Sequence, residues 1–433
     1  MNSRFKFVMV TSSTLLVVLL LAGARYGRSA SPEDTYRHLA VYTEVLSRIK
    51  SDYVEEPDMK SVTLGAVNGL LESIDPYASY LNADQYKQYL KTNDQGKAGV
   101  GLLLSKRFGY VNIVSAIPGS PAAKAGLATG DVVESINGVA TRDMPLAFAD
   151  ILMRGDAGST VELGILRLRK PEPQKITLTR QKIDYPAVTG KLVDGVGVIE
   201  VRSLETDQVK EVDAQVKSLE KQGAKRFVLD LRNCASGSPE RGMELASLFL
   251  DKGLITYSQG QKSPRQDFNA TGQPVDAKLP LVVIANRGTA DGAEIAAAAL
   301  MDDKRAQVVG ERTYGDAAVR KAITMDDGAA VILSVAKYYS PGGKAIQDTG
   351  VTPNVPVADA DAAQDQSEDD AGPATPETPK SGDDLMMKKA IEVVKQDASV
   401  AGVRPAAANE SARKDLAPAD AVHVPTAAEQ PQR

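Results

Sequence analysis

Two acidic residues lie in segments whose surroundings could support chemistry. Asp291 stands in NRGTADGAEIAAAAL, 286–300, where a buried-looking strand, LPLVVIAN, runs into a turn of small residues and then an Ala-rich helix. A turn at such a strand-to-helix junction leaves backbone N–H groups free to bind an anion or a developing negative charge. Asp316 follows 25 residues later, in GERTYGDAAVR, 310–320. Two carboxylates that face one cleft repel each other unless they share a proton or meet a cation.

Arg320, at the end of the second segment, is a candidate for that cation. A guanidinium pairs with a carboxylate through two N–H donors, so Arg320 could close an ionic network with Asp316, Asp291 or both. The alternative is that the three side chains are independent of one another and form no network. A dyad of two aspartates that activates water is a further possibility. We expect neither a metal nor another cofactor, because no His or third acid stands at a ligand spacing.

Composition excludes several classes of protein. The chain has 433 residues, 43% hydrophobic and 25% charged, which suits two or three domains with their own cores. A net charge of −5 without a basic cluster argues against a nucleic-acid binder. Cys234 is the one cysteine, so neither an intramolecular disulfide nor a cysteine-based zinc site can form.

The start of the chain predicts export. Arg4 and Lys6 precede an uncharged run, 7–24, that fits a secretory signal or a marginal membrane anchor. We expect a periplasmic or cell-envelope protein, with cleavage or retention of the segment 1–30 left open.

The rest of the chain divides by its hydrophobic patterns. Apolar residues at helical spacing predict a helical N-terminal region, and short apolar runs broken by turns predict a β-rich domain. Alternating strands and helices then predict an α/β core with a mixed, partly parallel sheet. An acidic Pro/Ala linker, a terminal helix and a disordered tail follow. The helical region covers 31–95, the β-rich domain 96–182 and the α/β core 183–357. The linker covers 358–382, the terminal helix 383–398 and the disordered tail 399–433.

The β-rich part resembles a PDZ domain through the phrase SPAAKAGLATGDVVESINGVAT, 120–141. PDZ domains bind a peptide C-terminus as an added strand, and a glycine-containing loop donates N–H groups to the terminal carboxylate. The resemblance implies that Gly99, Val100, Gly101 and Leu102 form this loop, whereas an ordinary hairpin with two glycines is the simpler alternative.

The core resembles the carboxyl-terminal processing, or tail-specific, protease family. In that family a nucleophilic Ser stands three residues before a Glu-Ile pair, and a Lys base follows 25 residues later in a Thr-Phe-Gly-Lys-Gly-x-Val-Gln motif. Glu294-Ile295 and Thr313-Tyr314-Gly315 match these motifs. The match places Asp291 at the Ser, Asp316 at the Lys and Arg320 at the Gln. An Asp supplies no hydroxyl to activate, and no neutral amine stands at the base position.

The oxyanion turn and the remaining candidate nucleophiles give no obvious substitute. The family run Leu-Arg-Asn-Asn-Pro-Gly-Gly reads LRNCASG here, 231–237, so Ser236 replaces a Gly before Gly237, and we expect its Cβ to oppose the turn. Thr289 and Cys234 are the other hydroxyl and thiol near the motifs. The histidines, His38 and His423, lie far from them in sequence.

These observations predict a catalytically impaired envelope homologue, with no intact catalytic residue, that binds C-terminal tails of unfolded or envelope proteins. It could regulate an active relative or an adaptor, and it could form a homo-oligomer. Two alternatives stay open: an active serine-type endopeptidase that uses unrecognised residues, and a non-enzymatic envelope scaffold.

Overall fold

The computed structural model describes two compact units of the chain. The described residues are 32–92, 98–107, 109–142, 144–167, 170–272, 275, 279–358 and 384–396. Unit 1 comprises the chain up to Ile113, Ser120–Ile183 and Arg320–Ser334, and unit 2 comprises Val114–Gly119, Asp184–Val319 and the chain from Val335. The predicted signal or anchor, most of the linker and the tail lie outside the described residues. No helix within these residues combines the length and apolar character needed to cross a membrane.

The N-terminal part of unit 1 is helical, as the apolar spacing predicts. Asp58 caps the second helix, since its carboxylate accepts a hydrogen bond from Lys60 N at 3.0 Å. The elements are α2 (Pro32–Asp52), α3 (Met59–Ile74), the short strand β1 (Ser79–Leu81) and α4 (Ala83–Thr92).

A sheet in the order β2-β3-β4-β6-β7 follows in unit 1, and β5 pairs with β4. Inward-facing side chains such as Val133, Val161 and Ile165 are fully buried, as alternation along half-buried strands requires. The elements are β2 (Leu102–Arg107), β3 (Tyr110–Ala116), α5 (Pro121–Lys124), β4 (Val132–Ile136), β5 (Val139–Ala140), α6 (Leu146–Met153), β6 (Thr160–Arg167) and β7 (Lys170–Thr179). The last residues of β3, from Val114, group with unit 2.

A hairpin from late in the chain departs from the predicted core range, 183–357. It is formed by β15 (Ala318–Thr324) and β16 (Ala330–Tyr339), and its part from Arg320 to Ser334 belongs to unit 1. The reason is strand pairing: β1 pairs antiparallel with β16, with Ser79 opposite Ile332. Such long-range pairing leaves no local signal in the sequence.

Unit 2 is built on a sheet in the order β17-β14-β13-β10-β9-β8, in which neighbouring strands are parallel except for the β8–β9 pair. This confirms the mixed α/β core. The strands are β8 (Thr189–Val193), β9 (Val196–Glu200), β10 (Phe227–Asp230), β13 (Leu281–Ala285), β14 (Gln307–Gly310) and β17 (Val355–Pro356).

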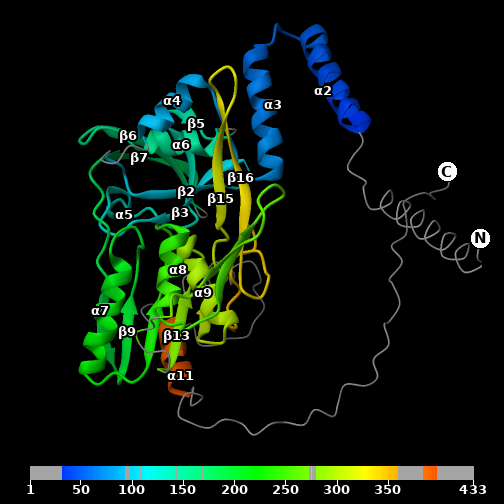
Figure 1. The fold of residues 1–433 in the computed structure, drawn as a ribbon. Helices are drawn as coiled ribbons and strands as arrows, with labels where there is room; N and C mark the ends of the chain where they lie inside the picture. Colours follow the sequence, from blue (N-terminus) through cyan, green and yellow to red (C-terminus); the bar gives the residue numbers. More distant parts are fainter. Residues whose placement is uncertain are drawn as a thin grey trace, which may run out of the picture. The chain divides into compact units, whose positions relative to one another are not determined.

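Helices cover both faces of this sheet. One face packs against α7 (Gln208–Lys221), α8 (Pro239–Ser247) and α9 (Gly292–Asp302) in the largest apolar cluster. The other face packs against Met386, Ala390 and Val394 of α11 (Leu385–Gln396), the predicted terminal helix. Figure 1 shows α11, in orange, beside β13, and α8 and α9 next to each other.

A side chain just beyond α9 contacts the segment that follows α8. Arg305 Nε donates to the carbonyl oxygen of Phe249, just after α8, at 3.0 Å.

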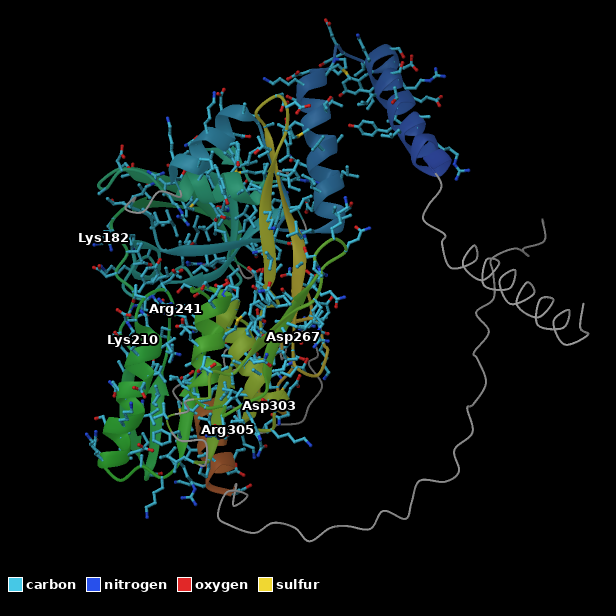
Figure 2. All side chains as sticks on the ribbon, in the orientation of Figure 1. Lys182, Lys210, Arg241, Asp267, Asp303 and Arg305 are labelled. Carbon is cyan, nitrogen blue, oxygen red and sulfur yellow. The ribbon has the colours of Figure 1, made fainter. Side chains whose placement is uncertain are left out.

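The exposed charges of Lys210, Asp267 and Asp303 lie on the outside of unit 2 (Figure 2). Asp267 belongs to the hairpin of β11 (Leu254–Gln259) and β12 (Gln266–Asn269), and β11 also pairs with the end of β16.

Candidate active site

Asp291 lies at a strained backbone position between β13 and α9. Its φ of 52° and ψ of −124° fall in a region that non-glycine residues seldom adopt, at a cost of about 1–3 kcal/mol. The preceding turn supports the strain: Asn286 N donates to Thr289 Oγ1 at 3.1 Å, and Ala290 N donates to the carbonyl oxygen of Cys234 at 3.0 Å. Residue 291 therefore lies at a tight turn between β13 and α9.

Asp316 lies next to this turn. Asp291 N donates to the carbonyl oxygen of Asp316 at 2.9 Å, and Tyr314 N donates to that of Thr289 at the same distance. The loop after β14 thus runs along the turn before α9. Gly315 permits this course, because its φ is 93° and a Cβ there would come within 3.0 Å of Gly350 N. The two acids are neighbours through their main chains.

Glu294 holds the two loops together and is the residue that sequence reasoning missed. Its fully buried carboxylate accepts hydrogen bonds from Gly315 N at 2.7 Å, Asp316 N at 2.9 Å and Asp291 N at 3.2 Å. Thr313 Oγ1 donates to the same carboxylate. The motif spacing predicts no role for Glu294 beyond its place in the Glu-Ile pair. The order Asp-x-x-Glu before an apolar helix, a capping-box arrangement, could have indicated its role.

Burial raises the pKa of Glu294 to about 7, and the hydrogen bonds from Thr313, Asp316 and Gly315 offset only part of this effect. The negative charge of Asp316 contributes in the same direction as burial. The carboxyl group therefore titrates near neutral pH although it is enclosed by donors.

The surroundings of Asp291 are rich in acids. Tyr338 is buried, and its pKa rises to about 12 through burial first and then through the charges of Glu240 and Asp291. Glu240 lies in the first turn of α8. A site that activates a hydroxyl with a neutral amine needs the opposite arrangement, in which basic groups surround the nucleophile. The negative charges of Asp291 and Glu240 instead favour the neutral form of the Tyr338 hydroxyl.

The turn after β10 contains Ser236 and Gly237. Ser236 lies outside the left-handed region, whereas Gly237 has a φ of 130° and a Cβ there would come 2.5 Å from Leu204 Cβ. Gly237 is thus a position of this turn that requires glycine, and the effect of Ser236 on an oxyanion site stays a prediction. Leu204 N donates to the carbonyl oxygen of Ser236 at 2.8 Å, and the hydroxyls of Ser236 and Ser203 are 3.0 Å apart.

Thr289 and Cys234 have structural roles. Thr289 is fully buried, and its hydroxyl donates to the carbonyl oxygen of Leu231 at 2.8 Å while accepting from Asn286 N. Cys234 is fully buried too, and burial raises the pKa of its thiol to about 12, so almost no thiolate exists at neutral pH. His38 lies on α2 in unit 1, and His423 lies outside the described residues.

Arg320 has a contact that the ionic-network hypothesis did not include. Its guanidinium lies over the ring of Tyr77, 4.1 Å from the ring centroid, and both residues belong to unit 1. Asp291 and Asp316 belong to unit 2. The pairing of Arg320 with these acids stays a prediction.

An ionic cluster connects the strand before the oxyanion turn with α11. Arg232 donates to Asp230 at 3.0 and 2.7 Å and to Asp384 at 2.9 and 2.8 Å. Burial alone would lower the pKa of Arg232, but its hydrogen bonds to Asp230 and Asp384 raise it. Burial likewise opposes ionisation of Asp230, yet Arg232 and Arg202 hold its pKa below the usual value. The cluster therefore favours the charged forms of Arg232 and Asp230.

The predicted peptide-binding loop of unit 1 precedes the edge strand β2. Gly99 and Gln181 exchange two backbone hydrogen bonds of 2.9 Å, and the carbonyl oxygen of Val100 accepts one from Ala122 N at 3.0 Å. Gly101 has a φ of 76°, and a Cβ there would come 2.2 Å from Ser120 Cβ. Leu102 opens β2, which ends the sheet order. Among the described strands β2 pairs only with β3, so its other edge has the geometry for an added strand.

Comparison with known proteins gives consistent matches in both units. Residues 113–167 match the PDZ domain and residues 195–357 match peptidase family S41. A carboxyl-terminal-processing protease of Picosynechococcus is 32% identical over 398 residues, which cover 89% of this chain and 91% of that protein. One from Synechocystis is 33% identical and covers 78% of this chain and 79% of its own.

A solved structure shows the same architecture. The photosystem II D1 C-terminal processing protease has a TM-score of 0.62 at 27% identity, over 74% of this chain and 92% of that one. The similarity extends across most of both chains.

Proposed function

The chain belongs to the carboxyl-terminal-processing protease family, and from that membership we propose that it binds protein tails without cutting them by the family's serine and lysine chemistry. The observation that carries the proposal is the pair Asp291 and Asp316. Their main chains lie 2.9 Å apart, N to O, so the two motif positions adjoin as a dyad would. Both carry carboxylates, which supply neither a hydroxyl nucleophile nor an amine base.

The surroundings of the pair support the same conclusion. The acid-rich field at Tyr338 and the enclosure of Thr289 and Cys234 leave these three groups neutral and unreactive at pH 7. The proposed loss of activity rests on the two dyad positions, and the altered turn at Ser236 and Gly237 is a second part of the proposal.

The binding half of the proposal rests on the loop Gly99–Leu102 and the edge of β2. A tail that adds to β2 as an antiparallel strand would gain main-chain hydrogen bonds, and its terminal carboxylate would reach the loop N–H groups. The ligands are C-terminal tails of unfolded or envelope proteins. We further propose an exported protein of the cell envelope that regulates an active relative or an adaptor, because the uncharged run 7–24 after Arg4 and Lys6 suits export.

The test combines binding and cleavage on the full chain. A fluorescent peptide with a free apolar C-terminus is titrated with the protein, and its C-terminal amide serves as the control. We expect saturable binding of the free acid, weak binding of the amide and no cleavage of an unfolded substrate that bears the same tail. Cleavage by the unmodified chain that disappears in Asp291→Ala would overturn the proposal, whereas equal affinity for acid and amide would favour the scaffold alternative.

A further inference from the structure

Asp291 is followed by glycine, and the backbone torsion between the two residues has an unusual consequence. The ψ of Asp291 is −124°. The substituents of a tetrahedral Cα are spaced by a third of a turn, so in an L-residue this ψ nearly eclipses the Gly292 nitrogen with Cβ of Asp291. The same φ and ψ occur at the first central residue of a type II′ turn. The nitrogen and the side chain therefore lie on one side, as a five-membered ring requires.

The geometry points to Asp291–Gly292 as a site of spontaneous succinimide formation and isoaspartate exchange. The Gly292 nitrogen bonds to Cγ of the protonated Asp291 carboxyl, and one carboxyl oxygen leaves as water with the amide proton. Water then opens the ring at Cγ, which restores aspartate, or at the main-chain carbon, which gives the isoaspartyl link. The backbone already holds the near-attack torsion, so the Asp291 carboxyl has to leave the Glu294 N–H that it caps and set χ1.

One feature of the fold favours the reaction, and another keeps glycine at position 292. Gly292 is the first residue of α9, where the helix supplies no acceptor for the N–H and its dipole stabilises negative charge on nitrogen. Gly292 also cannot become a larger residue without rearrangement, because a Cβ there would come 2.5 Å from the carbonyl oxygen of Ser238. Close packing of α8 and α9 thus enforces the reactive pair.

The structure contains matched controls in Asp194–Gly195 and Asp327–Gly328. Asp194 lies between β8 and β9 with a φ of 51°, and its carboxylate pairs with Lys395 Nζ at 3.3 Å. Asp327 accepts a hydrogen bond from Ala329 N at 3.0 Å, and Gly328 has a φ of 81°. Both pairs lie in hairpin turns. All three pairs have the same chemistry and differ in backbone setting.

The test incubates the full chain in water enriched in ¹⁸O at pH 7.4 and 37 °C. Each succinimide cycle introduces one labelled oxygen, even when aspartate is restored. Trypsin separates the three sites into the peptides 288–304, 192–202 and 322–337, and mass spectrometry reads the label in each. We expect about tenfold more label at Asp291 than at the other two sites, and loss of this preference in guanidinium, which removes the held torsion.

Equal or slower labelling of Asp291 in the native chain would refute the inference. Asp291→Glu provides a second check, because its ring would have six members and its label should fall to background. The inference does not depend on tail binding or on the absence of cleavage, so its failure would leave the proposed function untouched.

Discussion

The backbone N–H of Asp291 donates to the carbonyl oxygen of Asp316 at 2.9 Å, while Glu294 accepts from both residues' N–H groups. Two acids from separate loops thus share one carboxylate clamp. The clamp fixes the main-chain positions of residues 291 and 316, whichever side chains they carry. The two motif positions are therefore held next to each other through their main chains.

Restoring the dyad should restore some activity. We expect the double variant Asp291→Ser plus Asp316→Lys to cleave an unfolded substrate with a free apolar tail, because the clamp places the new hydroxyl and amine next to each other. Release of fluorescent fragments measures the rate. Each single variant serves as a control and should stay at background, and an inactive double variant that binds tails and folds normally would contradict the prediction.

The pH dependence of stability should change when Glu294 loses its charge. Its pKa of about 7 in the folded protein exceeds the ordinary 4.5, so its contribution to stability is full below pH 4.5 and is lost as pH rises through 7. The loss amounts to about 3 kcal/mol. Urea unfolding of Glu294→Gln between pH 4.5 and 8 should show a flatter profile.

The same variant should loosen the clamp, because the amide keeps one acceptor oxygen and its NH₂ group cannot accept from the backbone N–H groups that face it. Amide exchange at 313–316 reports this effect. An unchanged pH profile in Glu294→Gln would show that another group carries the titration.

The peptide-binding loop should fail on substitution of Gly101. A Cβ there meets Ser120 Cβ at 2.2 Å, so we expect Gly101→Ala to weaken tail binding by more than tenfold. Gly126→Ala is the matched control, because Gly126 has a similar φ of 72° and nothing within 4 Å of the added Cβ. Its cost should be backbone strain alone, about 1 kcal/mol. Equal tail affinity in the two variants, measured by fluorescence anisotropy, would argue against this loop as the binding site.

The ion pair between Arg232 and Asp384 should anchor α11. Asp384→Asn keeps an acceptor for Met387 N at the helix start but removes the charge that Arg232 binds. The side chain of Asp384 is 44% exposed, so solvent screening limits the expected loss to about 1 kcal/mol. Faster amide exchange in 385–396 reports the loosened helix. Glu392→Gln, which removes an exposed pair with Lys389 on the same helix, should leave the exchange unchanged.

Cys234 should resist alkylation in the folded chain. Its burial and its pKa near 12 leave almost no accessible thiolate at pH 7.5. Maleimide labelling followed by intact mass should show no adduct in buffer and one adduct in guanidinium. Rapid labelling of the native chain would reopen the thiol as a candidate nucleophile.

The sequence by itself determined the types of the main elements and the identity of the two acids. Period-two and helical patterns predicted the β-rich sheet, the α/β core and the helix α11, since these patterns record which face of each element is buried. The motif spacing identified Asp291 and Asp316 without any structure. Local signals sufficed for both.

Only the tertiary structure decided which of these residues meet. The clamp at Glu294 joins residues about 20 positions apart, and the pairing of β1 with β16 joins residues more than 250 apart. The left-handed backbone at Gly237 rather than Ser236 also depends on Leu204, a residue from another strand's end. Contacts of this kind arise where separate segments pack, and a single sequence specifies the segments more directly than their packing. For that reason the acids were visible in the sequence, whereas the buried carboxylate that positions them was not.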